Sequence, residues 1–423
     1  MELKKYKLSE VAKVEISSVD KKTKENETLV RLCNFTDVYH NWAITMELSD
    51  KFMTASANSN EIAKFSIKKG QVAFTKDSET RDDIGIPTYI ADDFDNVLLG
   101  YHCALITPDE SKVCGKYLNA FMHSDYIQKY FENSASGSGQ RYTLSLETIE
   151  GMPLLLPSLE KQKTIGELFS SLDRKIALNR AINRNLEALA KQLYDYWFVQ
   201  FDFPDEKGRP YKSSGGKMVW NEVLKREVPE GWEAKTLFES TNVQYGFPFS
   251  TESFTEEITD VPVVRIRDIL DGTVSAYSYE DTDEKYHLQE GDVLVGMDGN
   301  FHMNYWHNNN AYLNQRCVRI RPYCDSPISS IQVLHAIKPY IKAKEQNAKG
   351  STVGHLSDKD MKGLFLLEPK VSQLYNPRKT FDPILKQIIK NKQEIAALTH
   401  QRDELLPLLM NGQVEVRGEQ YLT

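Results

Sequence analysis

The sequence lacks the hallmarks of several large protein classes. Its 423 residues include five cysteines and no Cys-x-x-Cys pair: Cys33, Cys103, Cys114, Cys317 and Cys324. An odd number of scattered cysteines favours a reducing compartment over a disulfide framework and offers no zinc-binding spacing. No apolar run approaches the roughly 20 residues of a membrane span, and the first residues, Met-Glu-Leu-Lys-Lys, lack the apolar stretch of a signal peptide. We therefore expect a soluble, cytoplasmic protein without disulfides, metal or other cofactors.

Positive charge is also scarce. The chain has 52 Lys and Arg against 60 Asp and Glu, a formal net charge of −8. This is the wrong sign for a protein that coats DNA nonspecifically, because affinity for phosphates comes mainly from Lys and Arg that displace counterions. Any DNA contact must therefore be local or shared with a partner, while an ordinary acidic surface explains most of the carboxylates.

Catalytic motifs are missing as well. The nearest approach to the Asn/Asp-Pro-Pro-Tyr/Phe element of an amine methyltransferase, Asn376-Pro-Arg378, departs at its third residue. Gly215-Gly-Lys217 lacks the earlier glycine and the hydroxyl of a phosphate-binding loop. The most nuclease-like group is Asp95, Glu110 and Lys112, since carboxylates with a lysine can hold Mg²⁺ and activate water. Such groups are also common in exposed turns, so the sequence favours a protein without catalysis.

What the sequence does contain is an internal repeat at an offset of about 212 positions. Leu144-Ser145 corresponds to Leu356-Ser357. Further upstream, Gly70 and Gly291 each precede an apolar run, which predicts a turn followed by a strand. Each half is therefore expected to hold an α+β globule that is followed by a long helix.

Two segments show the seam of a coiled coil, in which apolar residues recur at alternating spacings of three and four. The first seam comprises Ile165, Phe169, Leu172, Ile176, Asn179, Leu186 and Leu193. The second comprises Ile384, Ile388, Asn391, Ile395, Leu398 and Leu405. Neither helix is apolar all round, so we expect the two seams to pack on each other within the chain, as an antiparallel pair.

The ends and the polar positions of these helices can also be predicted. A helix from Glu160 to Trp197 would be about 57 Å long at 1.5 Å per residue. Asp382-Pro383 supplies an N-cap and a first-turn proline, so the second helix is expected to start there, and Pro407 should kink or end it. A polar seam residue fixes register, so Asn179 and Asn391 are expected within about a turn of the crossing point. Alternatively, each bonds water or nearby backbone.

Many short motifs in a fixed order carry a resemblance to a known family. Met-Pro-Leu-Leu-Leu-Pro at 152–157 leads into the first helix, and Phe201-Asp-Phe-Pro204 follows that helix. Pro229-Glu-Gly-Trp232, Gly246-Phe-Pro-Phe249 and Asn314-Gln-Arg316 come later. In these motifs and their spacing, the chain resembles the specificity subunit of type I restriction-modification systems over essentially its whole length.

The resemblance implies a non-catalytic DNA-binding protein. In that family, two target-recognition domains each read half of a split, asymmetric double-stranded DNA site, and two helical regions set the gap. The helices also dock two adenine methyltransferase (modification) subunits and, through them, ATP-dependent restriction subunits. The implied parts are target-recognition domains at 1–152 and 232–369, helical spacers at 153–200 and 370–423, and a linker at 201–231. The second spacer departs from the family pattern, because it lacks the Pro-x-x-x-Gln element of the first.

Candidate DNA-contacting residues lie in polar loops that follow strands or combine glycine with hydrogen-bonding side chains. Base edges carry sequence information, and Arg and Gln can make bidentate contacts with guanine and adenine. Candidates in the first domain are Lys76, Arg81, Ser136, Ser138, Gln140, Arg141 and Tyr142. Candidates in the second are Tyr245, Phe247, Asn300, His302, Asn304, Arg316, Lys349, Ser351, Thr352 and His355. Each loop can also be read as a polar surface turn.

Two other functions stay open at this stage. One is a self-contained Mg-dependent nuclease built on Asp95, Glu110 and Lys112, which would cleave DNA without a partner. The other is a coiled-coil scaffold that binds proteins but no DNA, which would show no sequence preference with a methyltransferase partner. The two globules differ between their shared anchors, so the two half-sites are expected to differ, although neutral drift explains such divergence too.

Overall fold

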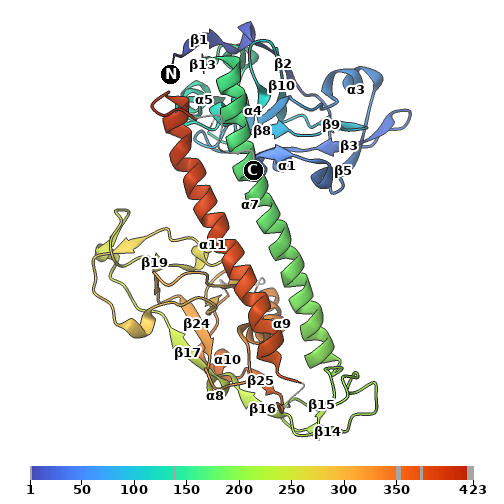
Figure 1. The fold of residues 1–423 in the computed structure, drawn as a ribbon, viewed down its shortest axis with the longest axis vertical. Helices are drawn as coiled ribbons and strands as arrows, with labels where there is room; N and C mark the ends of the chain where they lie inside the picture. Colours follow the sequence, from blue (N-terminus) through green and yellow to red (C-terminus); the bar gives the residue numbers. More distant parts are fainter. Residues whose placement is uncertain (1, 138, 349–353, 372–374, 417–423) are drawn as a thin grey trace. The chain divides into compact units, whose positions relative to one another are not determined.

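The computed structural model describes residues 2–137, 139–348, 354–371 and 375–416. The chain divides into two compact units, which we call unit 1 (Met1–Ala177 with Ala397–Thr423) and unit 2 (Leu178–Ala396). Two long helices, α7 (Leu159–Tyr194) and α11 (Pro377–Met410), cross this division, so each unit contains part of both (Figure 1). In the part of the chain that the structure describes, no helix is long and apolar enough to span a membrane.

Unit 1 is built on a five-stranded mixed sheet. Its strands, in sheet order, are β2 (Ala12–Ile16), β10 (Cys103–Pro108), β6 (Val72–Thr75), β8 (Pro87–Ile90) and β4 (Ala43–Ile44). The register pairs Ile106 of β10 with Val14 on one side and Val72 on the other. Every residue of β6 and β8 is buried, as expected for strands that are covered on both faces.

Smaller sheets and short helices complete unit 1. The small sheets are β5 (Met53–Ala57), β3 (Thr28–Cys33) and β9 (Val97–Leu99); β1 (Lys4–Lys7) with β13 (Pro153–Leu156); and β11 (Ser136–Gly137), β12 (Tyr142–Thr143) and β7 (Asp77–Ser78). The helices are η1 (Leu8–Glu10), α1 (Phe35–Tyr39), α2 (Met46–Ser49), α3 (Ser59–Phe65), α4 (Gly115–Met122), α5 (Asp125–Ser134) and α6 (Leu146–Glu150). The main core lies between the central sheet, α4, α5 and the two long helices.

Unit 2 has a four-stranded central sheet. Its order is β17 (Thr241–Tyr245), β24 (Cys317–Pro322), β21 (Val293–Gly296) and β22 (Met303–Tyr305). The two-stranded sheets are β14 (Met218–Asn221) with β15 (Arg226–Pro229), β16 (Glu233–Thr236) with β25 (Phe365–Glu368), β18 (Phe254–Thr255) with β20 (Tyr277–Ser278), and β19 (Val263–Val264) with β23 (Tyr312–Leu313). The helices are α8 (Leu237–Ser240), η3 (Thr251–Ser253), η4 (Ile266–Asp268), η5 (Glu284–Tyr286), α9 (Ser330–Ala348) and α10 (Asp358–Lys362).

The two units share one topology, which confirms the predicted internal repeat. The sheet order β2-β10-β6-β8 of unit 1 corresponds to β17-β24-β21-β22 of unit 2. The pair β1-β13 corresponds to β16-β25, and the parallel pair β3-β9 corresponds to β19-β23. The turn glycines Gly70 and Gly291 both have positive φ, +93° and +84°, a conformation that favours glycine. Ser145 and Ser357 each cap the short helix that follows them.

The long helices pair in opposite directions inside each unit. In unit 1, Ile165 and Phe169 near the start of α7 share a core with Leu409 near the end of α11. In unit 2, the end of α7 packs against the start of α11, where Trp197 makes an edge contact with Phe381. This arrangement confirms the predicted α+β fold with two domains and an antiparallel helix pair. Seam residues that are only partly buried, such as Leu186, lie among these contacts.

Asparagines bond directly across the helix pair in unit 2. Asn391 Nδ2 donates to Asn183 Oδ1 at 2.8 Å, and Asn183 Nδ2 donates to the carbonyl of Ile388 at 3.1 Å. Asn183, and not the equivalent seam residue Asn179, is therefore the partner of Asn391. Asn179 is buried one turn earlier on α7, so both predicted asparagines lie near this polar contact.

The start of the second helix was predicted wrongly. α11 begins at Pro377 and not at Asp382-Pro383. Asn376 precedes the helix and accepts hydrogen bonds from the N–H groups of Arg378 and Lys379, while Pro377 takes the first position, where no donor is needed. Arg378 also anchors this turn by donating to the carbonyls of three residues: Tyr323, Cys324 and Ser326. The first helix matches its predicted range, with one π-helical turn, η2 (Asp195–Val199), at its end.

Candidate functional site

A buried carboxylate organises the polar surface at one end of the central sheet of unit 1. Asp77 starts β7, directly after the apolar strand β6, and its side chain is 11% exposed. Its Oδ1 accepts a hydrogen bond from Lys76 Nζ at 2.8 Å, and its Oδ2 lies 2.7 Å from His102 Nδ1 and 3.3 Å from Arg141 Nη2. We call Lys76, Asp77, His102 and Arg141 the Asp77 cluster. It joins one acidic group to three basic side chains from three separate segments.

Backbone hydrogen bonds bring these segments together. The N–H of Lys76 donates to the carbonyl of His102 at 3.0 Å, and the N–H of Leu144 donates to the carbonyl of Lys76 at 2.9 Å. Arg141 directly precedes β12, whose residue Tyr142 pairs with Ser78 of β7. One edge of the Lys76–Ser78 segment therefore pairs with the turn that contains His102, and the other edge pairs with β12, which directly follows Arg141.

Electrostatics in this cluster keep Asp77 ionised. Burial alone would raise the pKa of Asp77, but hydrogen bonds from His102, Lys76 and Thr143 outweigh it and hold the pKa below its usual value. The Arg141 side chain is 56% exposed, so its guanidinium faces solvent while one nitrogen is held by the protein. Its Nη2 also lies 3.0 Å from His102 Nε2. The arrangement exposes the Arg141 guanidinium, while Lys76 and His102, each 16% exposed, hold Asp77 from beneath the surface.

Unit 2 contains a similar group, the Asp298 cluster, which comprises Asp298, Arg316 and His355. Asp298 Oδ1 lies 2.5 Å from His355 Nδ1, and Oδ2 pairs with Arg316 Nη1. Burial would raise the pKa of Asp298, but hydrogen bonds from His355 and Arg316 lower it below its usual value. The side chains of Arg316 and His355 are 59% and 56% exposed. A partly buried carboxylate thus supports two exposed basic groups here.

The Asp298 cluster borders a hollow of about 510 Å³. Its lining residues are Tyr245, Met297, Gln315, Arg316, His355 and Asp358. Tyr245 donates its hydroxyl to Asp358 at 2.8 Å, and burial together with this carboxylate raises the pKa of Tyr245. Tyrosine therefore remains a neutral donor and acceptor beside the arginine. The hollow brings three of the predicted DNA-contacting residues, Tyr245, Arg316 and His355, to one place.

The two clusters occupy equivalent places in the repeat. Met297 stands where Lys76 stands: its N–H donates to the carbonyl of Arg316, and its carbonyl accepts from Leu356. Asp298 therefore corresponds to Asp77. By the same pairing, Arg316 corresponds to His102, since each directly precedes the equivalent strand, β24 or β10. The carboxylate is common to both units, whereas the basic residues around it differ.

The remaining candidates of unit 1 lie near the Asp77 cluster. Ser136 pairs with Thr143 in the small sheet, and the Arg81 guanidinium lies 5.2 Å from the ring centre of Tyr142. Gln140 is exposed in the turn between β11 and β12. Lys76, Arg81, Ser136, Arg141 and Tyr142 thus converge on β11-β12-β7, as expected if their loops form one surface. Ser138 lies outside the described residues.

The other candidates of unit 2 are placed differently. Phe247 packs edge-on against Phe249 and Tyr286, with ring centres 4.9 and 5.2 Å apart. Asn304 accepts a hydrogen bond from Lys392 of α11 at 2.6 Å and donates to the carbonyl of Leu270. These contacts give Phe247 and Asn304 structural tasks. Asn300 and His302 lie in the turn before β22, where the N–H of His302 donates to the carbonyl of Asn300 at 2.8 Å. Lys349, Ser351 and Thr352 lie outside the described residues.

Several residues of the site were missed by sequence reasoning. Asp77 and Asp298 each lie seven positions after the turn glycine of their half, Gly70 or Gly291. A comparison of the two halves at this offset could have found both. His102 gave no such signal, because it enters the cluster through strand pairing alone.

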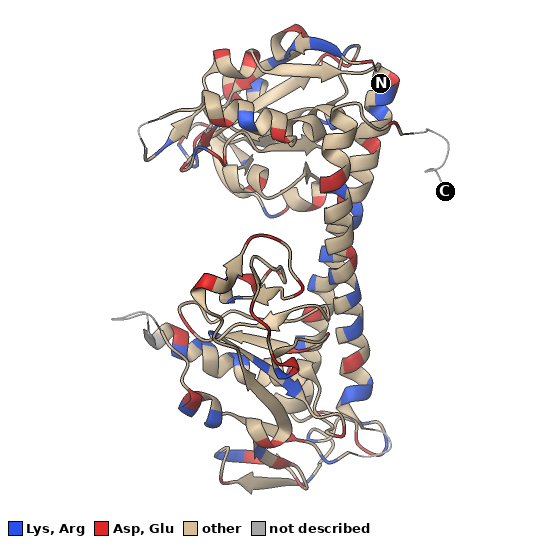
Figure 2. Cartoon of the chain, turned by 90° about the vertical axis from the view of Figure 1, so that its left-hand side faces the viewer, with Lys and Arg blue, Asp and Glu red and all other residues tan. Residues whose placement is uncertain are grey.

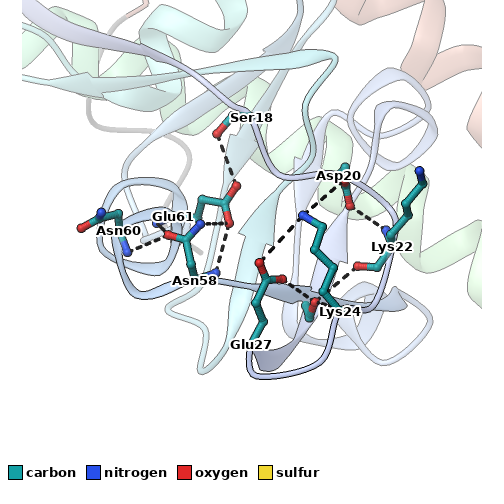
Figure 3. Close-up of polar contacts among 9 residues, drawn as sticks. Ser18, Asp20, Lys22, Lys24, Glu27, Asn58, Asn60 and Glu61 are labelled. Carbon is teal, nitrogen blue, oxygen red and sulfur yellow. Dashed lines mark hydrogen bonds and ion pairs between the residues drawn. The ribbon is translucent and has the colours of Figure 1, made fainter.

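A lysine-bearing loop of unit 1 was also missed. It leaves the core at Val19, whose carbonyl accepts from Tyr101, the neighbour of His102. Figure 3 shows how the loop is held: Lys24 Nζ lies 3.5 Å from Asp20 and 3.8 Å from Glu27, and the N–H of Lys22 donates to Asp20 at 2.8 Å. The exposed lysines of this loop alternate with Asp20, Glu25 and Glu27, as Lys and Arg are interspersed with Asp and Glu elsewhere in the chain (Figure 2).

The residues considered for nuclease chemistry, Asp95, Glu110 and Lys112, make only local contacts or face solvent. Lys112 pairs with Asp109 at 3.2 Å and donates to the carbonyl of Glu10 at 3.1 Å. Asp95 and Glu110 are exposed. Among the residues that the structure describes, no group of three or more His, Cys, Asp or Glu side chains could hold a metal ion. These contacts are typical of a solvated turn.

The comparison with protein families gives a match over most of the chain. Residues 2–188 and 229–399 match the family model described as the type I restriction modification DNA specificity domain. The match falls in two segments, one in each half of the internal repeat.

Similar curated proteins carry related names. The type I restriction enzyme MjaIX specificity subunit of Methanocaldococcus jannaschii is 24% identical over 317 residues, which cover 72% of this chain and 70% of that protein. The type I restriction enzyme HindI specificity subunit of Haemophilus influenzae is 22% identical over 408 residues, covering 83% and 88%. The EcoBI specificity subunit of Escherichia coli is 27% identical over 200 residues, covering 46% and 42%.

A solved structure shares the fold. The crystal structure of the type I restriction-modification system S subunit from M. genitalium superposes with a TM-score of 0.59 at 17% identity, and the match covers 97% of this chain and 96% of that one.

Proposed function

Because the chain belongs to the type I restriction-modification DNA specificity family, we propose that it reads an asymmetric, two-part site in double-stranded DNA. It is a non-catalytic specificity subunit, like the relatives that it matches. In this role it would direct two adenine methyltransferase subunits and, through them, ATP-dependent restriction subunits to that site. The proposal gives each unit one half of the site to read.

The observation that carries this proposal is the pair of equivalent but unlike clusters. Asp77 and Asp298 hold the same position in the repeat, yet the basic residues around them come from different positions. Arg and His donors at different places favour different base edges. Two copies of one scaffold with different donors are what a reader of two unlike half-sites requires.

The proposed parts follow the repeat. Residues 1–152 and 232–369 form the target-recognition domains, residues 153–200 and 370–423 form the helical spacers, and 201–231 is the linker. The DNA-contacting surface consists of the Asp77 and Asp298 clusters with the candidates that lie beside them: Arg81, Ser136, Gln140, Tyr142 and Tyr245. Phe247 and Asn304 would support this surface by packing and hydrogen bonding rather than by reading bases.

The exposed side of α7 supports a role in partner binding. Three apolar residues of its second half are exposed, Leu178 by 60%, Ile182 by 37% and Leu189 by 43%. They recur at helical spacing on the side of α7 that the other long helix does not cover, and clustered apolar exposure on one helix face is typical of a protein interface. Docking of a methyltransferase subunit there would bury them.

The test is the DNA motif that the complex methylates. The chain is co-expressed with the adenine methyltransferase subunit of its own system in a host without other adenine methylation, and the genome is sequenced for N6-methyladenine. We expect one motif with two unlike specified parts separated by a fixed unspecified gap. Methylation without a motif would favour the scaffold alternative. Cleavage of DNA by the purified chain with Mg²⁺ alone would favour the nuclease alternative.

A second experiment tests the proposed role of the helices in setting the gap. Four alanines are inserted after Ala177 in α7 and four more after Ala396 in α11, at the division between the units. Four helical residues add about 6 Å, which is close to two base pairs of B-DNA at about 34 Å per helical turn. The unspecified gap should lengthen while both half-sites stay the same; an unchanged gap would contradict the proposal.

A further inference from the structure

Building on the proposed function, we infer that Asp77 and Asp298 are equivalent positioning residues, each of which aims an arginine at a guanine in one half-site. The arginines are Arg141 in unit 1 and Arg316 in unit 2. The ligand is therefore the major-groove edge of guanine, which offers two acceptors to one guanidinium. One guanine in each half-site would depend on a carboxylate that does not touch DNA.

The first argument is the presence of a negative charge at the centre of each cluster. A surface that only binds phosphates gains from every Lys and Arg and loses from a carboxylate. Yet Asp77 and Asp298, whose side chains are 11% and 21% exposed, each pair with an exposed arginine, Arg141 or Arg316. A carboxylate at this place weakens nonspecific attraction. The carboxylate instead fixes the orientation of the arginine, because a hydrogen-bonded guanidinium has fewer accessible conformations.

The second argument is geometric. A guanidinium has five N–H donors in a planar fork. Asp77 takes one nitrogen of Arg141, Nη2, at 3.3 Å, and Asp298 takes one nitrogen of Arg316, Nη1. In Arg316, Nε and Nη2 remain as adjacent donors on one edge of the fork, as a bidentate contact to guanine requires. In Arg141, Nη2 also lies 3.0 Å from His102 Nε2, so Nη1, with both of its N–H groups, is the terminal nitrogen that remains for the base.

Histidine completes the support in both clusters by a different route. His102 Nδ1 lies 2.7 Å from Asp77 Oδ2, the oxygen that Arg141 also contacts, and His102 Nε2 lies 3.0 Å from Arg141 Nη2. His355 instead takes the free oxygen of Asp298, Oδ1, while Arg316 takes Oδ2. The oxygen that the arginine does not contact is held by Lys76 in Asp77 and by His355 in Asp298, which restricts the rotation of each carboxylate. The arginine comes from the turn before β12 in unit 1 and from the turn before β24 in unit 2, so the two arginines reach different positions of their half-sites.

The experiment compares the methylated motif of the wild-type complex with those of Asp77→Asn and Asp298→Asn. Asparagine keeps the size of the side chain but removes its charge. We expect Asp77→Asn to relax one guanine position in one half-site, with the preference for guanine reduced by about tenfold or more. Asp298→Asn should relax one guanine position in the other half-site. Neither variant should change the opposite half-site or the gap.

Two further variants make the result independent of protein stability. Arg141→Ala and Arg316→Ala alter exposed side chains, and each should relax the same position as the variant of its carboxylate. Asp83→Asn is the matched control: Asp83 accepts a hydrogen bond from the Tyr39 hydroxyl in unit 1, and its loss should leave the motif as in the wild type.

The outcomes separate the two levels of the proposal. If the wild-type complex shows no two-part motif, the proposed function itself fails. If the wild-type motif is present but the Asp→Asn and Arg→Ala variants methylate the same motif, only more weakly, these residues are merely structural and the inference is overturned. Relaxation at a position other than guanine, or at different positions for the aspartate and its arginine, would overturn it as well.

Discussion

Replacing one asparagine of the Asn183–Asn391 pair should destabilise unit 2 far more than replacing both. In Asn391→Leu, the buried Asn183 Oδ1 loses the donor that lies 2.8 Å away. In Asn183→Leu, Asn391 Nδ2 loses its acceptor, and Asn391 is only 3% exposed. A buried polar group without a partner costs about 1–3 kcal/mol, whereas replacing both partners by apolar groups of similar shape is nearly neutral.

The expected magnitudes follow from these contacts. Each single variant should lose about 2 kcal/mol, because one buried amide group is left unpaired. A loss of about 2 kcal/mol corresponds to a fall in Tm of about 4–8 °C for a unit of this size. The double variant Asn183→Leu/Asn391→Leu should lie close to the wild type, since both seam positions then resemble the apolar seam around them. The coupling free energy of the pair, the two single losses minus the loss in the double variant, should therefore be about 4 kcal/mol.

Urea unfolding followed by tryptophan fluorescence measures this cycle. All tryptophans except Trp42 lie in unit 2, so the signal reports mainly on that unit. The control is Asn185→Leu, an exposed position on the same helix, which should shift stability by no more than about 0.5 kcal/mol. If the losses of the two single variants simply add in the double variant, the asparagines are not coupled and the reasoning is refuted.

Three further predictions concern unit 1. Burial lowers the pKa of His123 to about 3, whereas a histidine in the unfolded chain has a pKa of about 6.5. Between these two pH values the unfolded state binds more protons than the folded state. The free energy of unfolding should therefore fall as the pH drops below about 6.5, by up to about 1.4 kcal/mol per pH unit. His123→Phe, which can keep the stacking on Trp42, should show a shallower loss of urea resistance between about pH 6.5 and 5; an equal slope would contradict this. Gly166→Ala should lower the Tm although alanine favours a helix by about 1 kcal/mol, because the new Cβ would lie 2.8 Å from the backbone nitrogen of Tyr117; a higher Tm would show that α4 can move aside. Lys22→Gln with Lys24→Gln should weaken DNA binding for all sequences alike and reduce the salt dependence by about 0.9 per lost phosphate contact, measured by titration at several salt concentrations; an altered methylation motif would instead assign these lysines to base reading.

Local patterns explain why much of the fold was predictable. The seams that include Phe169 and Ile388 are periodic over many turns, and such periodicity requires only neighbouring residues. The matching turn glycines and the repeated Leu-Ser pair indicated the same elements in both halves, and in the structure the glycines have positive φ and the serines cap short helices. The start of α11 was missed because two prolines, Pro377 and Pro383, both suit a first turn. Anchoring of Arg378 to a distant loop selected the earlier one.

The site was predictable only in part. Polar loops after strands led to Lys76, Arg141, Arg316 and His355, which the structure brings to equivalent clusters, while the loops by themselves gave no sign of a shared carboxylate. Asp77 reaches His102 across 25 positions and Arg141 across 64. No local pattern reports contacts at such separations, since they depend on which strands pair. Phe247 and Asn304 were expected on the DNA-contacting surface, but Phe247 packs against Tyr286 and Asn304 accepts a hydrogen bond from Lys392. These contacts also depend on the tertiary structure.

The sequence by itself determined that this protein has two similar α+β units and two long helices with matching seams, because heptad spacing, turn glycines and repeated motifs are properties of neighbouring residues. Only the tertiary structure decided that Asn183 rather than Asn179 bonds Asn391, and that one aspartate supports the basic groups of each unit. These choices depend on strand register and helix alignment, and a shift of one residue in a strand or one turn in a helix changes every partner.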